Sequence, residues 1–293
     1  LTSLALMNLL PQRARRTAAR LSLDGEDLRQ AGERRMADIR GNTMAMIFQE
    51  PMTSLNPAYT IGNQLEETLL RHRKVAQREA RERAVFLLGK VGITAAESRL
   101  KQYPHQLSGG LRQRVMIAMA LMCGPELIIA DEPTTALDVT IQAQILLLLA
   151  ELQKEFNMGM ILITHDLGVV ARVADRVAVM YAGQIVESGT AKQVFESPTH
   201  PYTQGLLDCI PIPGKTERGR PLGSIPGIVP ALIGEQAGCH FAERCAHAAP
   251  DCRSQKIDLR DGQAEGHRYR CILSPERCAA NLVGAVPVQE ASA

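Results

Sequence analysis

The strongest constraint on the fold is a short apolar run that ends in two adjacent carboxylates. Residues 127–130 read Leu-Ile-Ile-Ala, Asp131 and Glu132 follow, and Pro133 stops the run. A short apolar run bounded by a breaker is typical of a buried strand in a parallel sheet. The two charges cannot lie in the core, because burying an unpaired carboxylate is very costly. We therefore expect Asp131 and Glu132 to face a crevice at the carboxyl ends of the strands, where open α/β folds bind ligands.

Other polar side chains follow predicted strands in the same way. Gln49 comes directly after one apolar run, and His165 comes directly after another. Because the carboxyl ends of parallel strands share one sheet edge, we expect both side chains to lie near Asp131 and Glu132. Such an edge can hold a magnesium ion on Asp131, a water beside Glu132 and a transferred phosphate. A lone histidine or acidic pair is more often a solvated strand end, so the prediction depends on the combination.

A second ligand-binding signal precedes an apolar helical segment. Ser108, Gly109 and Gly110 follow Leu107, and residues 115–122 are apolar. Serine is a preferred helix N-cap, and glycines allow a backbone to come close to a ligand. The free N–H groups and the dipole at such a helix end favour a phosphate. By itself this pattern more often marks a turn and a cap; together with the acidic strand that follows, it indicates a phosphate site.

The size and charge of the chain exclude several classes of protein. The 293 residues allow two domains, and the formal net charge of +2 argues against a nucleic-acid partner. No apolar run approaches the roughly 18–20 residues that span a bilayer. Proline and glycine become frequent after Ser197, and cysteine and histidine become frequent beyond Gly238. We expect a soluble cytoplasmic protein with a domain boundary near residue 198.

The ordered motifs resemble those of the ATPase subunit of an ATP-binding cassette (ABC) transporter. Gln49 matches the Q-loop of that family, and Leu107–Gly110 match its signature motif. Leu127–Glu132 match Walker B, Ala136–Asp138 match the D-loop, and His165 matches the switch histidine. Two longer segments, Phe48–Pro57 and Ser197–Leu207, resemble the ATPases of oligopeptide and dipeptide importers.

The resemblance implies an α/β fold with a P-loop NTPase core of the ABC type. The ATPase domain would cover residues 1–197 and would include an α-helical subdomain at about residues 53–125. A small Cys-rich C-terminal extension of the peptide-importer type would cover residues 198–293. This boundary agrees with the change in composition after Ser197.

The resemblance also implies a role for each residue at the sheet edge. Asp131 would hold Mg²⁺, and Glu132 would act as general base on the water that attacks ATP. His165 would orient that water or the γ-phosphate. Gln49 would contact the magnesium ion and transmit closure of the ATP site to the membrane subunits. The residues that would complete the ATP site of a second subunit are Leu107, Ser108, Gly109, Gly110 and Asp138.

These roles imply an ATP-hydrolysing subunit that drives import of di- or oligopeptides across the bacterial inner membrane. Its partners would be a second ABC ATPase subunit, two transmembrane permease subunits and, indirectly, a substrate-binding protein. It would lie at the cytoplasmic face of the membrane. Related importers also move nickel chelates and opines, so the exact substrate stays open. Two alternatives also stay open: a soluble ABC ATPase of translation or DNA repair, and a non-catalytic partner subunit.

One part of the family pattern does not occur in this sequence. The P-loop, G-x-x-x-x-G-K-[ST], is absent from the 293 residues, and residues 1–10 resemble the helix that directly follows it. P-loop amides and the P-loop lysine hold the β- and γ-phosphates. We therefore expect that the sequence lacks an N-terminal part that includes Walker A. The chain alone is then expected to be inactive, although it can still contribute its signature to a partner's ATP site.

The C-terminal tail contains a cluster of cysteines. Cys239, Cys245, Cys252 and Cys271 have the spacing C-x5-C-x6-C-x18-C. Four thiolates can hold zinc or an iron–sulfur cluster, whereas structural disulfides are rare in the cytoplasm. The tail resembles the cysteine-bearing C-terminal region of peptide-importer ATPases, where some members are implied to carry a [4Fe–4S] cluster. We favour a [4Fe–4S] cluster on these cysteines, with zinc as the alternative and incidental buried thiols as the simplest interpretation.

Overall fold

The structure is a computed structural model that describes residues 1–50, 54–135, 137–210, 223–234 and 237–279. The chain divides into two compact units, Leu1–His165 and Asp166–Ala293. The boundary expected near residue 198 lies inside the second unit and stays a prediction about domain organisation.

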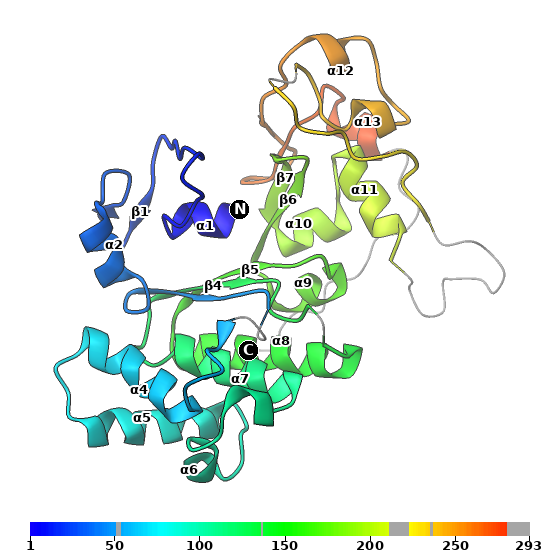
Figure 1. The fold of residues 1–293 in the computed structure, drawn as a ribbon. Helices are drawn as coiled ribbons and strands as arrows, with labels where there is room; N and C mark the ends of the chain where they lie inside the picture. The colour runs from blue at the N-terminus through cyan, green and yellow to red at the C-terminus, as the bar shows by residue number, and fades with distance from the viewer. Residues whose placement is uncertain (51–53, 136, 211–222, 235–236, 280–293) are drawn as a thin grey trace. The chain divides into compact units, whose positions relative to one another are not determined.

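The first unit is built on a parallel sheet of three strands. The strands are β3 (Met44–Ile47), β4 (Leu127–Asp131) and β5 (Gly159–Ile163), in the order β3-β4-β5. The apolar run before the two carboxylates is therefore a strand, as predicted, and it is the central one (Figure 1). Because all three strands run in the same direction, their carboxyl ends lie at one edge of the sheet.

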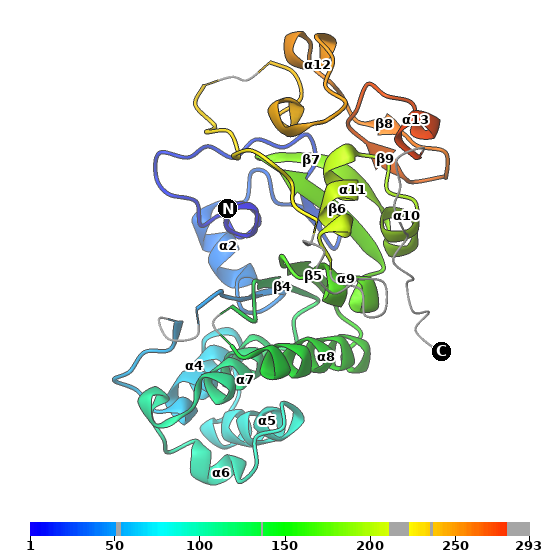
Figure 2. The same ribbon diagram turned by 90° about the vertical axis from the view of Figure 1, so that its right-hand side faces the viewer.

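Side chains of β4 contribute to a core on each face of the sheet. Successive side chains of a strand point to opposite faces. Ile128 and Ala130 pack into a core with helices on one face, whereas Ile129 packs into a second core with Met36 and Ile39. The first face is covered by α4 (Ile61–His72), α5 (Gln77–Lys90), α7 (Gly109–Ala120) and α8 (Val139–Glu155), and the second by α1 (Thr2–Leu6) and α2 (Glu33–Ile39) (Figures 1 and 2).

The shorter elements of this unit connect these layers. They are the two-stranded ladder of β1 (Ser22–Leu23) and β2 (Glu26–Asp27), helix α6 (Ala96–Arg99) and the 3₁₀ turn η1 (Pro104–Gln106). The helices between β3 and β4 fall within the range of about 53–125 that was predicted for a helical subdomain. Residues 51–53 lie outside the described residues, and the bounds of the subdomain stay a prediction.

The sequence pattern of β5 suggests a fully buried strand, and this expectation is wrong. Ile161 at its centre is 37% exposed. The reason is position: β5 pairs only with β4 among the described strands and therefore lies at an edge of the sheet. An apolar run of this length does not distinguish a central strand from an edge strand.

The second unit contains an antiparallel sheet. A hairpin is formed by β6 (Arg176–Tyr181) and β7 (Gln184–Thr190), joined by Ala182 and Gly183, which both have positive φ. Strand β7 also pairs with β9 (Arg268–Tyr269), which pairs with β8 (Arg260–Asp261). The helical elements are α9 (Leu167–Val173), α10 (Ala191–Glu196), α11 (Pro201–Asp208), η2 (Ala242–Arg244), α12 (Asp251–Ser254) and α13 (Pro275–Ala279).

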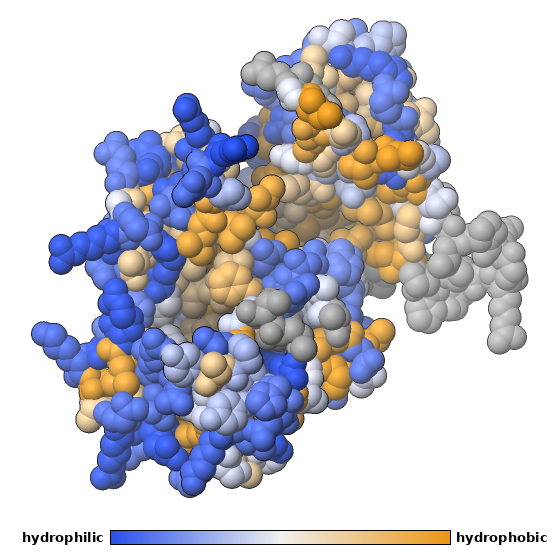
Figure 3. Space-filling model, viewed as in Figure 1, coloured by the Kyte–Doolittle hydropathy of each residue, from blue (hydrophilic) through white to orange (hydrophobic). Residues whose placement is uncertain are grey.

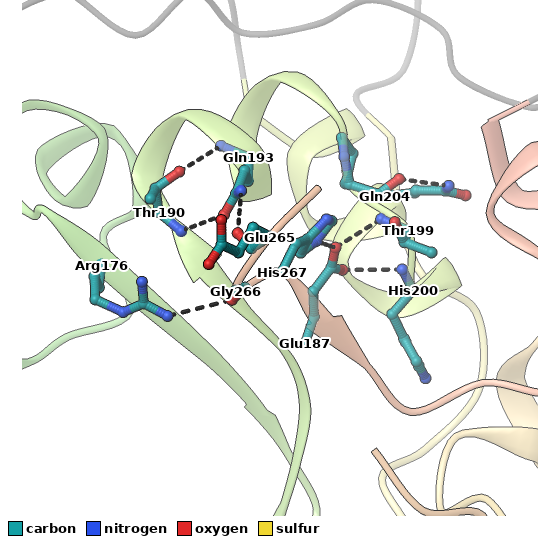
Figure 4. A network of polar contacts seen from close by, with 11 residues as sticks. Arg176, Glu187, Thr190, Gln193, Thr199, His200, Gln204, Glu265, Gly266 and His267 are labelled. Atoms are coloured by element: carbon teal, nitrogen blue, oxygen red, sulfur yellow. Dashed lines mark hydrogen bonds and ion pairs between the residues drawn. The ribbon is translucent and has the colours of Figure 1, made fainter. Parts of the chain in front are cut away.

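A buried carboxylate on β7 ties three segments of this unit together (Figure 4). The Glu187 side chain has no exposed surface, and its oxygens accept the backbone N–H groups of Thr199 (2.7 Å) and His200 (2.9 Å). His267, next to β9, places Nε2 2.7 Å from the same carboxylate. A buried charge is tolerated only when it is paired and hydrogen-bonded. Glu187 therefore fixes the chain after α10 and the C-terminal tail against β7.

Figure 3 shows a largely hydrophilic surface over α4 and α5. Within the described parts of the chain, no helix has the length and apolar character needed to cross a membrane.

The Glu187 network predicts a large difference between two acidic residues of the second unit. Glu187→Ala leaves two buried N–H groups and His267 without their acceptor, so we expect the free energy of unfolding of this unit to fall by about 3–5 kcal/mol. Glu243→Ala is the control, because Glu243 is 72% exposed and pairs with Arg253 at the surface. Its loss should stay below about 1 kcal/mol. Hydrogen exchange of β6 and β7 amides measures both, and equal losses would contradict the assignment.

Candidate functional site

Asp131 ends β4 at the carboxyl edge of the sheet, and a serine from the first helix holds it. Ser3 is completely buried on α1, and its hydroxyl donates a hydrogen bond to Oδ2 of Asp131. Asp131 itself is partly buried. This contact orients one carboxylate oxygen and leaves the other for a further ligand, which suits a residue expected to hold Mg²⁺ through hard oxygen donors.

Glu132 follows in a strained backbone conformation. Its φ is +46°, in the left-handed region that non-glycine residues rarely adopt. The N–H of Glu132 donates to the carbonyl oxygen of Ile163 at 2.8 Å, which links the ends of β4 and β5. Strain of this kind costs of order 1–3 kcal/mol and concentrates at functional sites. The turn away from the strand axis separates the side chain of Glu132 from that of Asp131.

Three side chains from different segments surround the Glu132 carboxylate. Gln49, two residues beyond β3, donates its amide N–H to Oε2 at 2.8 Å, and the Thr135 hydroxyl donates to the same oxygen at 2.9 Å. Nδ1 of His165, two residues beyond β5, lies 3.9 Å from Oε2 and is largely exposed. The structure thus brings together Gln49, Glu132 and His165 beside Asp131. The arrangement can position a water molecule, a cation and a phosphate, whereas the chemical role of each residue stays a prediction.

The predicted phosphate-binding turn begins α7. Ser108 occupies the N-cap position, and its hydroxyl accepts the N–H of Leu111 at 3.4 Å. Leu107 is buried and anchors the turn, while Ser108 and Gly109 are exposed. A side chain at Gly110 would come within 3.2 Å of Ile141 on α8. The exposed N–H end of α7 is therefore available to a ligand, and its packing against α8 restricts what can replace the glycine.

The residues expected to form the D-loop lie just before α8. Asp138 is the N-cap residue of α8, but its side chain makes no capping hydrogen bond. Asp138 is exposed, and Ala136 lies outside the described residues. An aspartate at this position could cap the helix or contact another subunit, and the structure shows no capping hydrogen bond from its side chain.

The four cysteines of the tail line one small cavity in the second unit. Cys239, Cys245, Cys252 and Cys271 all border it. Burial first, and then the three neighbouring thiols, raise the pKa of the Cys245 thiol to about 11. Within the described part of the chain, however, no group of three or more Cys, His, Asp or Glu side chains has the spacing of a metal site. The thiols converge without forming a finished coordination sphere.

Two side chains at the carboxyl edge of the parallel sheet, Ser3 and Thr135, were not predicted from the sequence. Ser3 lies in the first helix, and nothing in the sequence connects it with a strand 128 positions later. Thr135 follows Glu132 closely, and a Thr-Thr pair directly after Pro133 is a signal that could have indicated a hydroxyl near the carboxylate. Both residues orient carboxylates that the sequence did indicate.

Two protein-family models match this chain. Residues 5–135 match the model described as ABC transporter, and residues 186–252 match the model described as the C-terminal region of oligopeptide/dipeptide transporters. The first match contains the Q-loop, signature and Walker B segments, and the second contains Glu187, His200 and three of the clustered cysteines.

Relatives named as peptide transport ATP-binding proteins are similar over almost the whole chain. A putative peptide import ATP-binding protein of Brucella ovis is 53% identical over 288 residues, which cover 95% of this chain and 85% of that protein. The oligopeptide transport ATP-binding protein AppD of Bacillus subtilis is 50% identical, over 95% of this chain and 84% of its own length. The dipeptide transport ATP-binding protein DppD of Escherichia coli is 48% identical, over 92% and 82%.

Solved structures share the fold. CbiO1 of Clostridium perfringens, part of the ABC transporter complex cbiONQ, superimposes with a TM-score of 0.56 at 27% identity, covering 66% of this chain and 73% of that one. The ATP-binding cassette MJ0796, in a dimer bound to ADP and Pi, gives a TM-score of 0.51 at 29% identity, covering 58% and 72%. The predicted α/β fold of the ABC ATPase type is confirmed, whereas the Cys-rich C-terminal extension stays a prediction.

Because the backbone of Glu132 is left-handed, we predict that glycine is the more stable replacement there and alanine the less stable one, which is the reverse of the usual order. Glu132→Ala and Glu132→Gly both remove the side chain, but only glycine relieves the strain. We expect the glycine variant to unfold with a free energy about 1 kcal/mol higher than that of the alanine variant. At Glu126, which precedes β4 and does not have a positive φ, the order should reverse. Urea unfolding of the four variants tests this, and a less stable Glu132→Gly would contradict the strain.

Proposed function

This chain belongs to the ATP-binding proteins of ABC transporters, in the group that imports peptides, and we propose that it pairs with a second ATPase subunit to power two membrane permeases. Family membership, peptide import and ATP hydrolysis follow from the comparisons. The match of residues 186–252 to a peptide-transporter region argues against the alternative of translation or DNA repair. The pairing, the permeases and a place at the cytoplasmic face of the inner membrane form the proposal.

The convergence of side chains on Glu132 supports the catalytic part of this proposal. Glu132 is the general base that takes a proton from the water attacking the γ-phosphate of ATP, and His165 orients that water. Asp131 and the amide oxygen of Gln49 are hard oxygen donors that suit Mg²⁺, so they would hold it. When bound, Mg²⁺ neutralises the charge that develops on the phosphates. Ser3 and Thr135 keep Asp131 and Glu132 oriented.

The signature turn is proposed to act on the ATP site of the partner subunit. Leu107 is buried, whereas Ser108 and Gly109 at the start of α7 are exposed. A helix N-terminus with glycines favours phosphate oxygens. Asp138 is exposed without a capping contact and would reach the same subunit interface. Two copies or two homologous ATPase subunits would then each complete the site of the other.

The cysteine cavity is proposed to bind a [4Fe–4S] cluster. Four thiols from separated positions line it, and sulfur-only donors suit an iron–sulfur cluster or zinc. Backbone N–H groups of Phe241 and Ala242 lie against the sulfur of Cys239 and offset part of the effect of burial, which raises its pKa. When bound, such a cluster supplies one-electron redox chemistry or a rigid cross-link. The present spacing of the thiols requires them to move closer to share it.

Loss of the general base should abolish turnover. In the assembled transporter, Glu132→Gln keeps the side-chain size and removes the basic oxygen, so we expect ATP hydrolysis to fall by about 10²–10⁴ while ATP still closes the dimer. Glu126→Gln, at the other end of β4, is the control and should hydrolyse ATP normally. ATPase rates in proteoliposomes and subunit cross-linking in the presence of ATP measure both properties. Near-normal hydrolysis by Glu132→Gln would remove Glu132 from this role.

Metal analysis tests the cysteine cavity. Anaerobically purified protein should contain iron and acid-labile sulfide in equal amounts, and replacing Cys239, Cys245, Cys252 and Cys271 by serine should remove both. Cys123→Ser is the control, because Cys123 is a buried thiol of the first unit. Its iron content should not change. Zinc in place of iron, or no bound metal at all, would contradict the cluster.

A further inference from the structure

The side chain of Gln142 on α8 binds two backbone carbonyl groups that follow Glu132 in the chain. Its amide donates to the carbonyl oxygen of Leu137 at 2.9 Å and to that of Thr134 at 3.3 Å. Both bonds are partly buried, and the side chain reaches back along the chain from near the start of the helix. Gln142 therefore acts on the connection between the end of β4 and the start of α8.

The two carbonyl groups belong to a pair of successive turns that starts at Glu132. The N–H of Thr135 donates to the carbonyl oxygen of Glu132 at 3.2 Å. The N–H of Leu137 donates to the carbonyl oxygen of Thr134, also at 3.2 Å. A bond to the residue three positions earlier is typical of a β-turn. The amide of Gln142 thus binds both ends of the second turn and holds it closed.

Packing anchors the far end of these turns. Leu137 is one of the partly buried side chains that pack on the main core of the first unit. A side chain at Gly109 would come within 3.5 Å of Cδ2 of Leu137, so this methyl group lies against the signature turn. Ile141, one residue before Gln142, lies against Gly110 in the same way, and α7 and α8 run side by side (Figures 1 and 2). Gln142 therefore ties the turns to a part of the fold that is fixed from two sides.

The near end of the turns carries the hydroxyl group that holds Glu132. Thr135 donates this hydroxyl to Oε2 of Glu132 at 2.9 Å. The backbone of Glu132 has a φ of +46°, and strain of this kind persists only where the surrounding structure over-determines it. Without a bond that closes the turns, the backbone can relax this strain and carry the hydroxyl of Thr135 away from the carboxylate. A side chain that fixes the turns therefore also fixes the direction of the Glu132 carboxylate.

We propose that Gln142 is a positioning residue for ATP hydrolysis, which holds the Glu132 carboxylate in place through Thr135. Its role rests on the function proposed above, in which Glu132 takes the proton from the attacking water. Gln142 takes no part in the proton transfer, because its amide acts on the backbone that carries Thr135. A catalytic group displaced by about 1 Å can cost about 10²-fold in rate, so the loss of this remote hydrogen bond is sufficient to slow the chemical step.

Two substitutions of Gln142 separate its N–H donor from its packing. Gln142→Met keeps the length of the side chain and removes the donor. In the assembled transporter we expect its kcat to fall about tenfold, at a KM for ATP within about twofold of normal. Gln142→Lys again carries N–H donors and should keep most of the kcat. Gln153→Met is the matched control, because Gln153 donates to the carbonyl oxygen of Met158 at 2.9 Å at the other end of α8. Its kcat should stay normal.

A double-mutant cycle with Thr135→Val tests the route from Gln142 to Glu132. Because Gln142 acts through Thr135, the kcat of Gln142→Met/Thr135→Val should be no lower than that of the slower single variant. The kcat of Gln153→Met/Thr135→Val should equal that of Thr135→Val alone. ATPase rates are measured in proteoliposomes at saturating ATP and are expressed per assembled transporter. A variant that folds poorly then lowers the yield of transporter and leaves kcat unchanged.

The outcomes separate the role of Gln142 from the proposed function. Near-normal hydrolysis by Glu132→Gln overturns the general base, and the role of Gln142 with it. Loss of hydrolysis in Glu132→Gln together with a normal kcat in Gln142→Met overturns only the role of Gln142. Losses of kcat that multiply in Gln142→Met/Thr135→Val, or equal losses in Gln142→Lys and Gln142→Met, also overturn it. A slow Gln142→Met, a fast Gln142→Lys and no further loss in the double variant support the positioning role.

Discussion

The register of the central strand β4 positions everything else in the first unit. Ile47 pairs with Ala130, and Asp131 pairs with Ile163. Continuing this parallel register past the strand ends places Gln49 next to Glu132, with His165 one residue further on. The same strand cannot shift by one residue, because its alternating side chains fill two different cores, and a shift would exchange them. Packing on both faces of β4 therefore determines which polar side chains meet at its end.

The convergence at this edge could be predicted because it depends on local features of the sequence. Apolar runs that stop at a polar residue mark strand ends, and parallel strands end together. Ser3 could not be predicted, because its contact with Asp131 depends on how α1 packs on the sheet. The exposure of Ile161 was missed for a similar reason, since strand order decides which strand lies at the edge. What escaped prediction is the packing between elements and not the elements themselves.

The tail shows the same limit more strongly. The spacing of the cysteines suggested a shared site, and the structure places all four at one cavity. The sequence did not indicate Glu187, although an acidic residue inside an apolar β-hairpin strand is unusual. Its role depends on partners from two separate segments: the backbone amides of Thr199 and His200, and the ring of His267. A buried acid with three donors explains why the segment after α10 has one conformation, and that conformation sets the direction of His200.

The proposed mechanism also explains why residue 49 is a neutral amide. Gln49 donates its N–H to Glu132 at 2.8 Å. Because this bond uses the nitrogen of the amide, the amide oxygen could bind a cation at the same time. One side chain can therefore connect the magnesium site with the general base. A glutamate at this position would place a third carboxylate against Asp131 and Glu132, and the repulsion between like charges would push Glu132 away from the attacking water. An asparagine, one methylene shorter, could not reach both groups. In the proposed mechanism, an amide of this length would let a magnesium ion bound to the Gln49 oxygen strengthen the contact that holds Glu132 in place.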